Sequence, residues 1–176
     1  MKCMCNMKYF KAAYHNWDVA NRLIQFYHSN ELYINDAAYN LQQCVEKVLK
    51  AYLECKGVTV PPTHNIYKLI AMSKNNGSAV KLTDWIEQNQ YEIESWESDT
   101  RYNFDFVLEI GRIQEGIREV KHFLKINGLD YTLEDAITPE VKEALLQLLP
   151  SNLIIQDDFE LNCYYHIFKR KLETKK

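Results

Sequence analysis

Residues 37–50 read AAYNLQQCVEKVLK, and the period of this stretch predicts an amphipathic α-helix. Its apolar residues and those just after it recur at the spacing of a buried helix face: Ala37, Leu41, Val45, Val48 and Tyr52. At about 100° per residue, a second set falls together on the opposite side: Tyr39, Gln43, Glu46 and Lys50. We call this second set the polar ridge. By periodicity alone, the polar ridge is typical of a solvent-exposed helix face.

The same helical period recurs along the rest of the chain. It predicts further helices at about residues 17–30, 65–73, 83–95, 106–124, 139–149 and 158–172. Asn35 and Asp36 are the expected N-cap of the helix that carries the polar ridge, and Gly57 is its expected end. Thr63 is the expected cap of the next helix.

Two segments define how these helices are organised. Within 106–124 the apolar residues are spaced alternately by four and three positions, which is typical of an antiparallel helix bundle. Residues 97–103 carry turn-forming side chains and are expected to interrupt the helical structure before it. Residues 1–16 show no sustained period, so we expect an N-terminal arm there.

The composition is that of one compact helical protein. The chain has 176 residues, 47% of them hydrophobic, with only five glycines and four prolines, which is enough to bury one sizeable core. The formal net charge of -3 argues against a surface covered in positive potential, although a local basic patch remains compatible with it.

Cysteine usage points to reduced thiols in the cytoplasm. The five cysteines are odd in number and have no framework spacing, and Cys44 and Cys55 lie too far apart on one helix to bridge, at roughly 16 Å. The short patterns Cys3-x-Cys5 and Cys163-x-x-His166 each lack the other half of a metal site. No stretch approaches the roughly 20 apolar residues that span a bilayer. We therefore expect no metal, no cofactor and no membrane segment.

Three blocks of sequence resemble the HEPN family, the "higher eukaryotes and prokaryotes nucleotide-binding" helical domains. In chain order these blocks are Gln42-Gln43-x-x-Glu46-Lys47-x-Leu49-Lys50, then Thr63-His64-x-x-x-x-Leu69, then Thr100-Arg101-Tyr102. The resemblance covers about residues 17–125. It implies an all-α, up-and-down bundle of four or five helices, with residues 126–176 as a helical C-terminal extension. It also implies a homodimer.

The family resemblance implies a noncatalytic module that binds a nucleotide or RNA. We expect its anion-binding site to be formed by Tyr39, Gln43, Glu46, Lys47, Lys50, His64, Arg101 and Tyr102. Arginine and lysine supply cations for phosphate, tyrosines can stack on a base, and a helix N-terminus such as that beside His64 favours an anion. In the alternative interpretation, His64 only caps its helix and Arg101 pairs with Asp99 or Glu97.

A second function is suggested by ribonucleases of the same family, which use an arginine and a histidine on the last core helix without a metal. Here Arg118 and His122 occupy that helix, but the three residues between them are fewer than in those ribonucleases. The alternative is thus a metal-independent endoribonuclease that uses Arg118 and His122. A further alternative is a protein-interaction bundle with no nucleotide ligand. By family analogy, a small nucleotidyltransferase is the expected partner, in a toxin-antitoxin or stress-response system.

Overall fold

The computed structural model describes residues 7–102, 107–130, 138–149, 153–157, 160–165 and 168, with residues 101 and 102 described by their backbone alone. Every regular element in this part of the chain is helical, as the sequence predicted. The elements are α1 (Met7–Leu23), η1 (Ile24–Phe26), α2 (Leu32–Cys55), α3 (Ile66–Asn75), α4 (Asp84–Gln88), α5 (Gln90–Tyr102), α6 (Ile110–Ile126) and α7 (Pro139–Leu148). None of the described helices combines the length and apolar character needed to cross a membrane.

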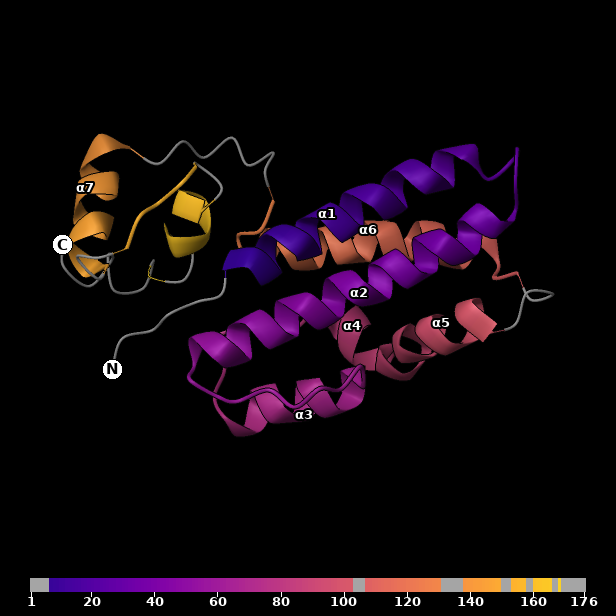
Figure 1. Cartoon of the computed structure of the whole chain (residues 1–176), viewed down its shortest axis with the longest axis horizontal. Helices are drawn as coiled ribbons and strands as arrows, with labels where there is room; N and C mark the ends of the chain where they lie inside the picture. The colour runs from indigo at the N-terminus through magenta and orange to yellow at the C-terminus, as the bar shows by residue number, and fades with distance from the viewer. Residues whose placement is uncertain are drawn as a thin grey trace.

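Helices α1, α2, α5 and α6 form an up-and-down four-helix bundle (Figure 1). The antiparallel pair α1 and α2 makes the most extensive contact, and α6 crosses behind both helices. The indole N–H of Trp17 on α1 donates to the carbonyl of Ile117 on α6 at 3.0 Å, which ties these helices together through a buried hydrogen bond. The expected fold class is therefore confirmed.

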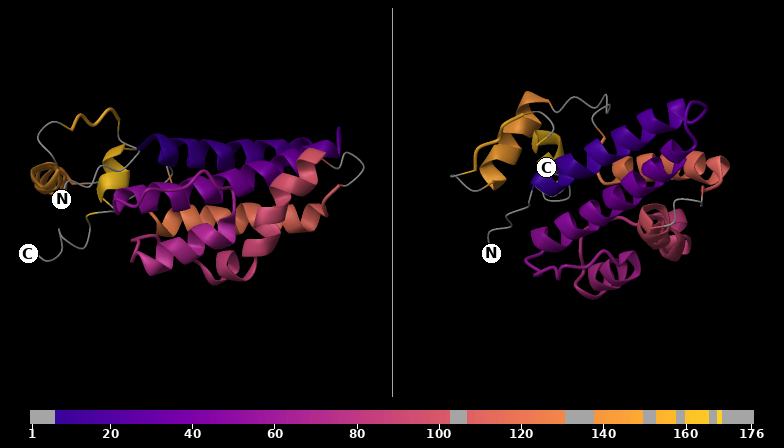
Figure 2. Two further views of the ribbon diagram at one scale, coloured as in Figure 1. Left: turned by 60° about the horizontal axis from the view of Figure 1, so that its bottom comes forward. Right: turned by 45° about the vertical axis from the view of Figure 1, so that its right-hand side comes forward.

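Helix α3 lies outside this alternation. After α2 ends, with Gly57 in the left-handed region (φ 80°), the chain returns along α2 to His64 before α3 begins. The extended connector contains Pro61 and Pro62, which fix φ and cannot continue a helix. As a result, α3 points in the same direction as α2, and it lies with α5 along the side of α2 away from α1 (Figures 1 and 2).

Several helix boundaries differ from those predicted. Residues 7–16, expected in an N-terminal arm, belong to α1, because Phe10 and Ala13 are fully buried and continue its apolar face. Helix α2 begins at Leu32, before the expected cap, and the side chain of Asn35 instead accepts a hydrogen bond from the amide of Leu108. The expected interruption at 97–103 was wrong as far as residue 102, because α5 continues to Tyr102.

The C-terminal extension packs at the end of the bundle where α1 begins (Figure 2). Thr138 caps α7 by accepting from the amide of Val141. The ammonium of Lys11 on α1 lies 2.8 Å from Asp157 and 2.9 Å from Glu160, which holds the extension to the first helix. The ends of the predicted helix at 158–172 lie outside the described residues.

The cysteines correct one expectation. Cys44 and Cys163 carry free thiols in the core, and burial raises the pKa of both thiols far above the ordinary value. Cys55 takes part in a disulfide bond, so the expectation of reduced thiols is wrong for this residue. Cys44 and Cys55 do not bridge each other, in agreement with their separation along α2.

Candidate functional site

The polar ridge of α2 is buried for most of its length, contrary to the solvent-exposed face that periodicity favoured. Gln43, Glu46 and Lys50 are 8%, 3% and 9% exposed, and the neighbouring Gln42 is fully buried. Gln42 and Glu46 contact His64 just before α3, and the carboxylate of Glu46 lies close to that of Glu97 on α5. Buried polar groups must find partners within the protein, so this part of α2 becomes a network of hydrogen bonds.

The carboxylate of Glu46 is the centre of that network. Its Oε1 lies 2.7 Å from the Lys50 ammonium, one helical turn further along α2. Its Oε2 accepts from the Gln42 side-chain amide at 3.0 Å and lies 3.1 Å from Nδ1 of His64. A second amide, that of Gln43, donates to the side-chain oxygen of Gln42 at 2.8 Å. Each charge of the pair is therefore neutralised locally, as burial demands.

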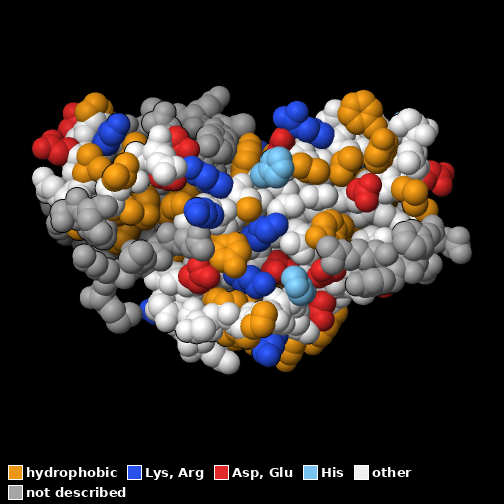
Figure 3. Space-filling view, in the orientation of Figure 1, with side chains coloured by type: hydrophobic (Ala, Val, Ile, Leu, Met, Phe, Trp, Pro, Cys, Tyr) orange, Lys and Arg blue, Asp and Glu red, His pale blue; other side chains and the backbone are white. Residues whose placement is uncertain are grey.

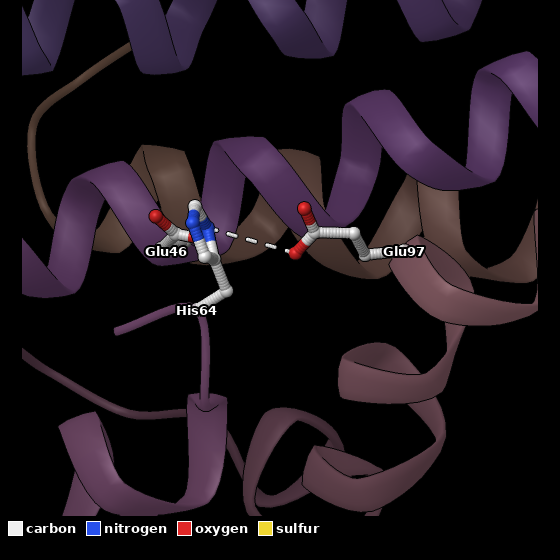
Figure 4. Close-up of side chains that lie close together, drawn as sticks. All are labelled: Glu46, His64 and Glu97. Carbon is white, nitrogen blue, oxygen red and sulfur yellow. Dashed lines mark hydrogen bonds and ion pairs between the residues drawn. The ribbon is translucent and has the colours of Figure 1, made fainter. Parts of the chain in front are cut away.

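His64 brings the network to the surface. Its backbone carbonyl faces the Gln42 amide at 3.4 Å, while its side chain is 63% exposed. The ring nitrogen Nδ1 contacts Glu46 and lies 3.6 Å from a carboxylate oxygen of Glu97 on α5 (Figure 4). In the neutral imidazole, a proton on Nδ1 that is donated to Glu46 leaves Nε2 as an acceptor.

The local structure explains why the His64 side chain can contact Glu46 and Glu97. Asn65, rather than the expected Thr63, is the N-cap of α3, and its side-chain oxygen accepts from the amide of Lys68 at 2.6 Å. Thr63 accepts from the amide of Asn65 at 3.2 Å. Because Asn65 satisfies the helix end, the His64 side chain is not needed as a cap and turns toward α2 and α5.

A metal centre was not expected from the sequence, yet the network contains a suitable set of donors. Glu46, His64 and Glu97 place one ligand atom each within 4.8 Å of one another. Carboxylate and imidazole ligands suit divalent transition metals. However, Oε2 of Glu46 already accepts from the Gln42 amide and lies 3.1 Å from Nδ1 of His64, so an ion at this point would have to compete with these contacts. The geometry favours the hydrogen-bonded network over a metal centre.

The remaining residues of the predicted site do not all join the network. Lys47 lies on the α1 side of α2, where its ammonium donates to the side-chain oxygen of Asn16 at 2.6 Å. Partial burial lowers the pKa of Lys47 from its ordinary value. Tyr39, earlier on α2, is partly buried. The side chains of Arg101 and Tyr102 lie outside the described residues, so their predicted roles remain predictions.

The alternative nuclease pair lies on a different surface. Arg118 and His122 are both exposed on α6, one helical turn apart. Among the described contacts, no hydrogen bond or ion pair joins either of them to an orienting group. They therefore lie on one face of α6, but within one chain no described contact holds either side chain in place.

Two members of the network were missed by the sequence analysis. Gln42 lies beside the polar ridge in sequence, but only the return of the connector places its amide between Glu46 and His64. Glu97 was expected in a turn, and it faces His64 only because α5 continues through it. The pair Gln42-Gln43 within the first resembling block was the one signal that could have pointed to Gln42.

Comparison with known proteins gives one match. The model of the HEPN domain family matches residues 8–129, which include α1 from its second residue, all of α2 to α6 and the whole Glu46 network. No curated protein and no solved structure matches the chain. Because the family model covers well over half of the sequence, the chain belongs to the HEPN family.

Proposed function

We propose that this chain is a noncatalytic HEPN module that binds a nucleotide or RNA beside His64. The family as a whole supports a nucleotide- or RNA-related role. The observation that carries the proposal is the buried Lys50–Glu46 pair, which reaches the surface through His64. Such a pair is costly to desolvate and contributes little stability compared with apolar side chains of similar size. A binding role explains a buried charged pair directly behind the exposed His64 better than stability does.

A source of positive charge lies about 100° around α2 from Glu46, on the side that faces α1. Figure 3 shows Lys and Arg side chains along the middle of the face that α1 and α2 form. Lys47 belongs to the interface of these helices, and the group it contacts, the amide of Asn16, is neutral. A cation with a neutral partner keeps its charge available for phosphate, whereas Lys50 is neutralised by Glu46. In this proposal Lys47 contacts a phosphate of the ligand, and His64 forms hydrogen bonds with the ligand's polar groups.

The noncatalytic part of the proposal rests on α6. There, three residues separate Arg118 from His122, fewer than in the ribonucleases of the family that use such a pair. We further propose, by family analogy, that the module is a cytoplasmic homodimer that works beside a small nucleotidyltransferase in a toxin-antitoxin or stress-response system. The dimer and the protein partner are proposed independently of the His64 site. Sedimentation tests the dimer, and co-purification tests the partner.

Binding of a fluorescein-labelled single-stranded RNA, followed by anisotropy over a range of salt concentrations, tests the proposal. Lys47→Ala should weaken binding and reduce the slope of log Kd against log salt by about 0.7, the contribution of one phosphate contact on a single strand. His64→Ala should weaken binding with a smaller change in slope. Lys56→Ala is the matched control, because Lys56 is exposed at the end of the same helix.

The outcomes separate the three functions. If the wild-type chain binds neither RNA nor mononucleotides, or if Lys47→Ala and Lys56→Ala behave alike, the binding proposal is wrong. Cleavage of the RNA in EDTA that disappears in His122→Ala would establish the endoribonuclease instead. A co-purifying protein, with no effect of nucleotides on the melting temperature, would favour the protein-interaction bundle.

A further inference from the structure

Two tyrosines are stacked on the surface where α3 meets α5. The ring centroids of Tyr67 and Tyr91 lie 5.3 Å apart, and the ring planes differ by 21°. Both residues are well exposed, Tyr67 at 48% and Tyr91 at 63%. Exposed single aromatic residues are ordinary, but a pair held nearly parallel in solvent presents an ordered aromatic surface.

This tyrosine pair continues the contacts that begin at His64. Three contacts join the N-terminal end of α3, and the residues just before it, to α5. They are His64 with Glu97, Asn65 with Glu94, and Tyr67 with Tyr91. The Asn65 amide donates to Glu94 at 2.8 Å, so the middle contact is a firm hydrogen bond. From residue 97 to residue 91 the α5 backbone advances by about 9 Å. The aromatic surface thus lies beside the His64 network, on the same seam.

The chemistry of the tyrosine pair suits a nucleobase. In a stacked pair each ring uses one face on its neighbour, and the exposure of Tyr91 leaves room for a third flat ring. Bases of single-stranded nucleic acids stack on aromatic side chains in this manner, whatever their sequence. Lys68, the next residue on α3, is also exposed and adds a cation to the same helix.

From this geometry we infer that Tyr67 and Tyr91 form a stacking platform for one base of a single-stranded RNA that is bound beside His64. The inference rests on the proposed function and makes it more specific. A base on the platform and polar contacts at His64 require a ligand that extends along the α3–α5 seam. The preferred ligand is consequently an oligonucleotide rather than a free mononucleotide.

Paired oligonucleotides with and without bases test the platform. Anisotropy is measured for a labelled single-stranded oligouridylate and for an abasic ribose-phosphate strand of the same length. Tyr91→Ala should weaken binding of oligouridylate by about tenfold, the lower range for the loss of one stacked base, and should leave the abasic strand unaffected. Tyr91→Phe should bind like the wild type, and Tyr91→Leu should behave like Tyr91→Ala because leucine has no aromatic face.

Phe26→Ala is the matched control, because Phe26 is an equally exposed aromatic residue, at 61%, in the turn between α1 and α2. Circular dichroism of each variant confirms that the bundle is folded. The platform is overturned if Tyr91→Ala binds oligouridylate as the wild type does while Lys47→Ala is weakened, and the proposed function then stands. It is also overturned if Tyr91→Ala weakens both strands equally, which indicates a structural role, or if it changes only the sedimentation of the protein. If the wild type binds mononucleotides but no RNA, the platform is overturned and the proposed function stands; if it binds neither, the proposed function itself is refuted.

Discussion

The two long sides of α2 are both buried, but they are stabilised in opposite ways. On one side Leu41, Val45 and Val48 have no solvent exposure and pack into the common hydrophobic core. On the other side Glu46 and Lys50 are also buried, at 3% and 9% exposure, and their charges are matched to each other and to the His64 turn. Apolar packing tolerates small changes of shape, whereas a buried charge requires every partner in place.

The reason for this difference lies in the neighbours of α2 rather than in α2 itself. Helices α3 and α5 carry apolar residues that must also be buried, among them Ile66, Ile93 and Trp96, each with no exposure. When these helices pack, they cover the polar ridge as well. The cost of covering charged groups is reduced only because Gln42 and His64 arrive with matching donors. A polar helix face is therefore compatible with burial when its neighbours supply the complementary groups.

The largest effect is expected from breaking the charged pair. Glu46→Ala leaves the Lys50 ammonium buried and unpaired, and should lower the free energy of unfolding by about 3–5 kcal/mol. The double variant Glu46→Met with Lys50→Met removes both charges and should cost less than Glu46→Ala alone. Urea unfolding of the single and double variants measures these differences. If the losses of the single variants Glu46→Met and Lys50→Met add up to that of the double variant, the pair is not energetically coupled, and the contrast between the two sides of α2 fails.

A smaller effect is expected where α6 meets the apolar side of α2. A Cβ added at Gly116 would lie 3.0 Å from Cη2 of Trp96 and 3.2 Å from Cδ1 of Leu41, so Gly116→Ala should lose about 1–2 kcal/mol through overpacking. Gly111→Ala on the same helix is the control, since its Cβ would meet only Glu109 at 3.6 Å. That substitution should be neutral or should stabilise the fold by up to about 1 kcal/mol through helix propensity. Thermal unfolding of both variants distinguishes them, and equal effects would contradict tight packing at Gly116.

The smallest effect concerns Cys44, whose thiol lies in the core beside α1. Burial raises the pKa of this thiol in the folded state, so the unfolded chain ionises first, near pH 8.5. Its contribution to stability is complete below that pH and is lost at higher pH, at up to about 1.4 kcal/mol per pH unit. Urea unfolding at pH 7.5 and 9.5 should therefore show a larger loss for the wild type than for Cys44→Ala. Equal losses would mean that the thiol is hydrated in the folded protein.

The sequence predicted the architecture well because the helical period and the residues that cap or end helices are local properties. The end of α2 near Gly57, the end of α6 near Gly128 and the Thr138 cap of α7 all follow from the conformational preferences of the residues concerned. The wrong predictions of helix boundaries also arose from local sequence patterns. Turn-forming side chains at 97–102 suggested a break, but Trp96 is fully buried, and the packing of its helix outweighs weak propensities in the turn that follows.

The candidate site was predicted only in part. The sequence shows which residue types are present, but the packing of the helices decides which of them meet. The resemblance drew attention to Glu46, Lys50 and His64, and the structure brings these three side chains within hydrogen-bonding distance. It grouped Lys47 with them, although the direction of this side chain on the helix places it against α1. Glu97 and the Tyr67–Tyr91 pair had no sequence signal, since each depends on the distance between α3 and α5.

By itself, the sequence of residues 37–50 determined that α2 is a helix with one apolar side and one polar side. It could not determine whether water or protein covers the polar side, because the helical period reports contrast between faces and not exposure. That was decided by the tertiary structure, through the connector that returns His64 along α2 and through the continuous helix α5. The physical reason is that a charge pair can be buried only where distant segments complete its hydrogen bonds, and such segments are brought together by packing of the whole bundle.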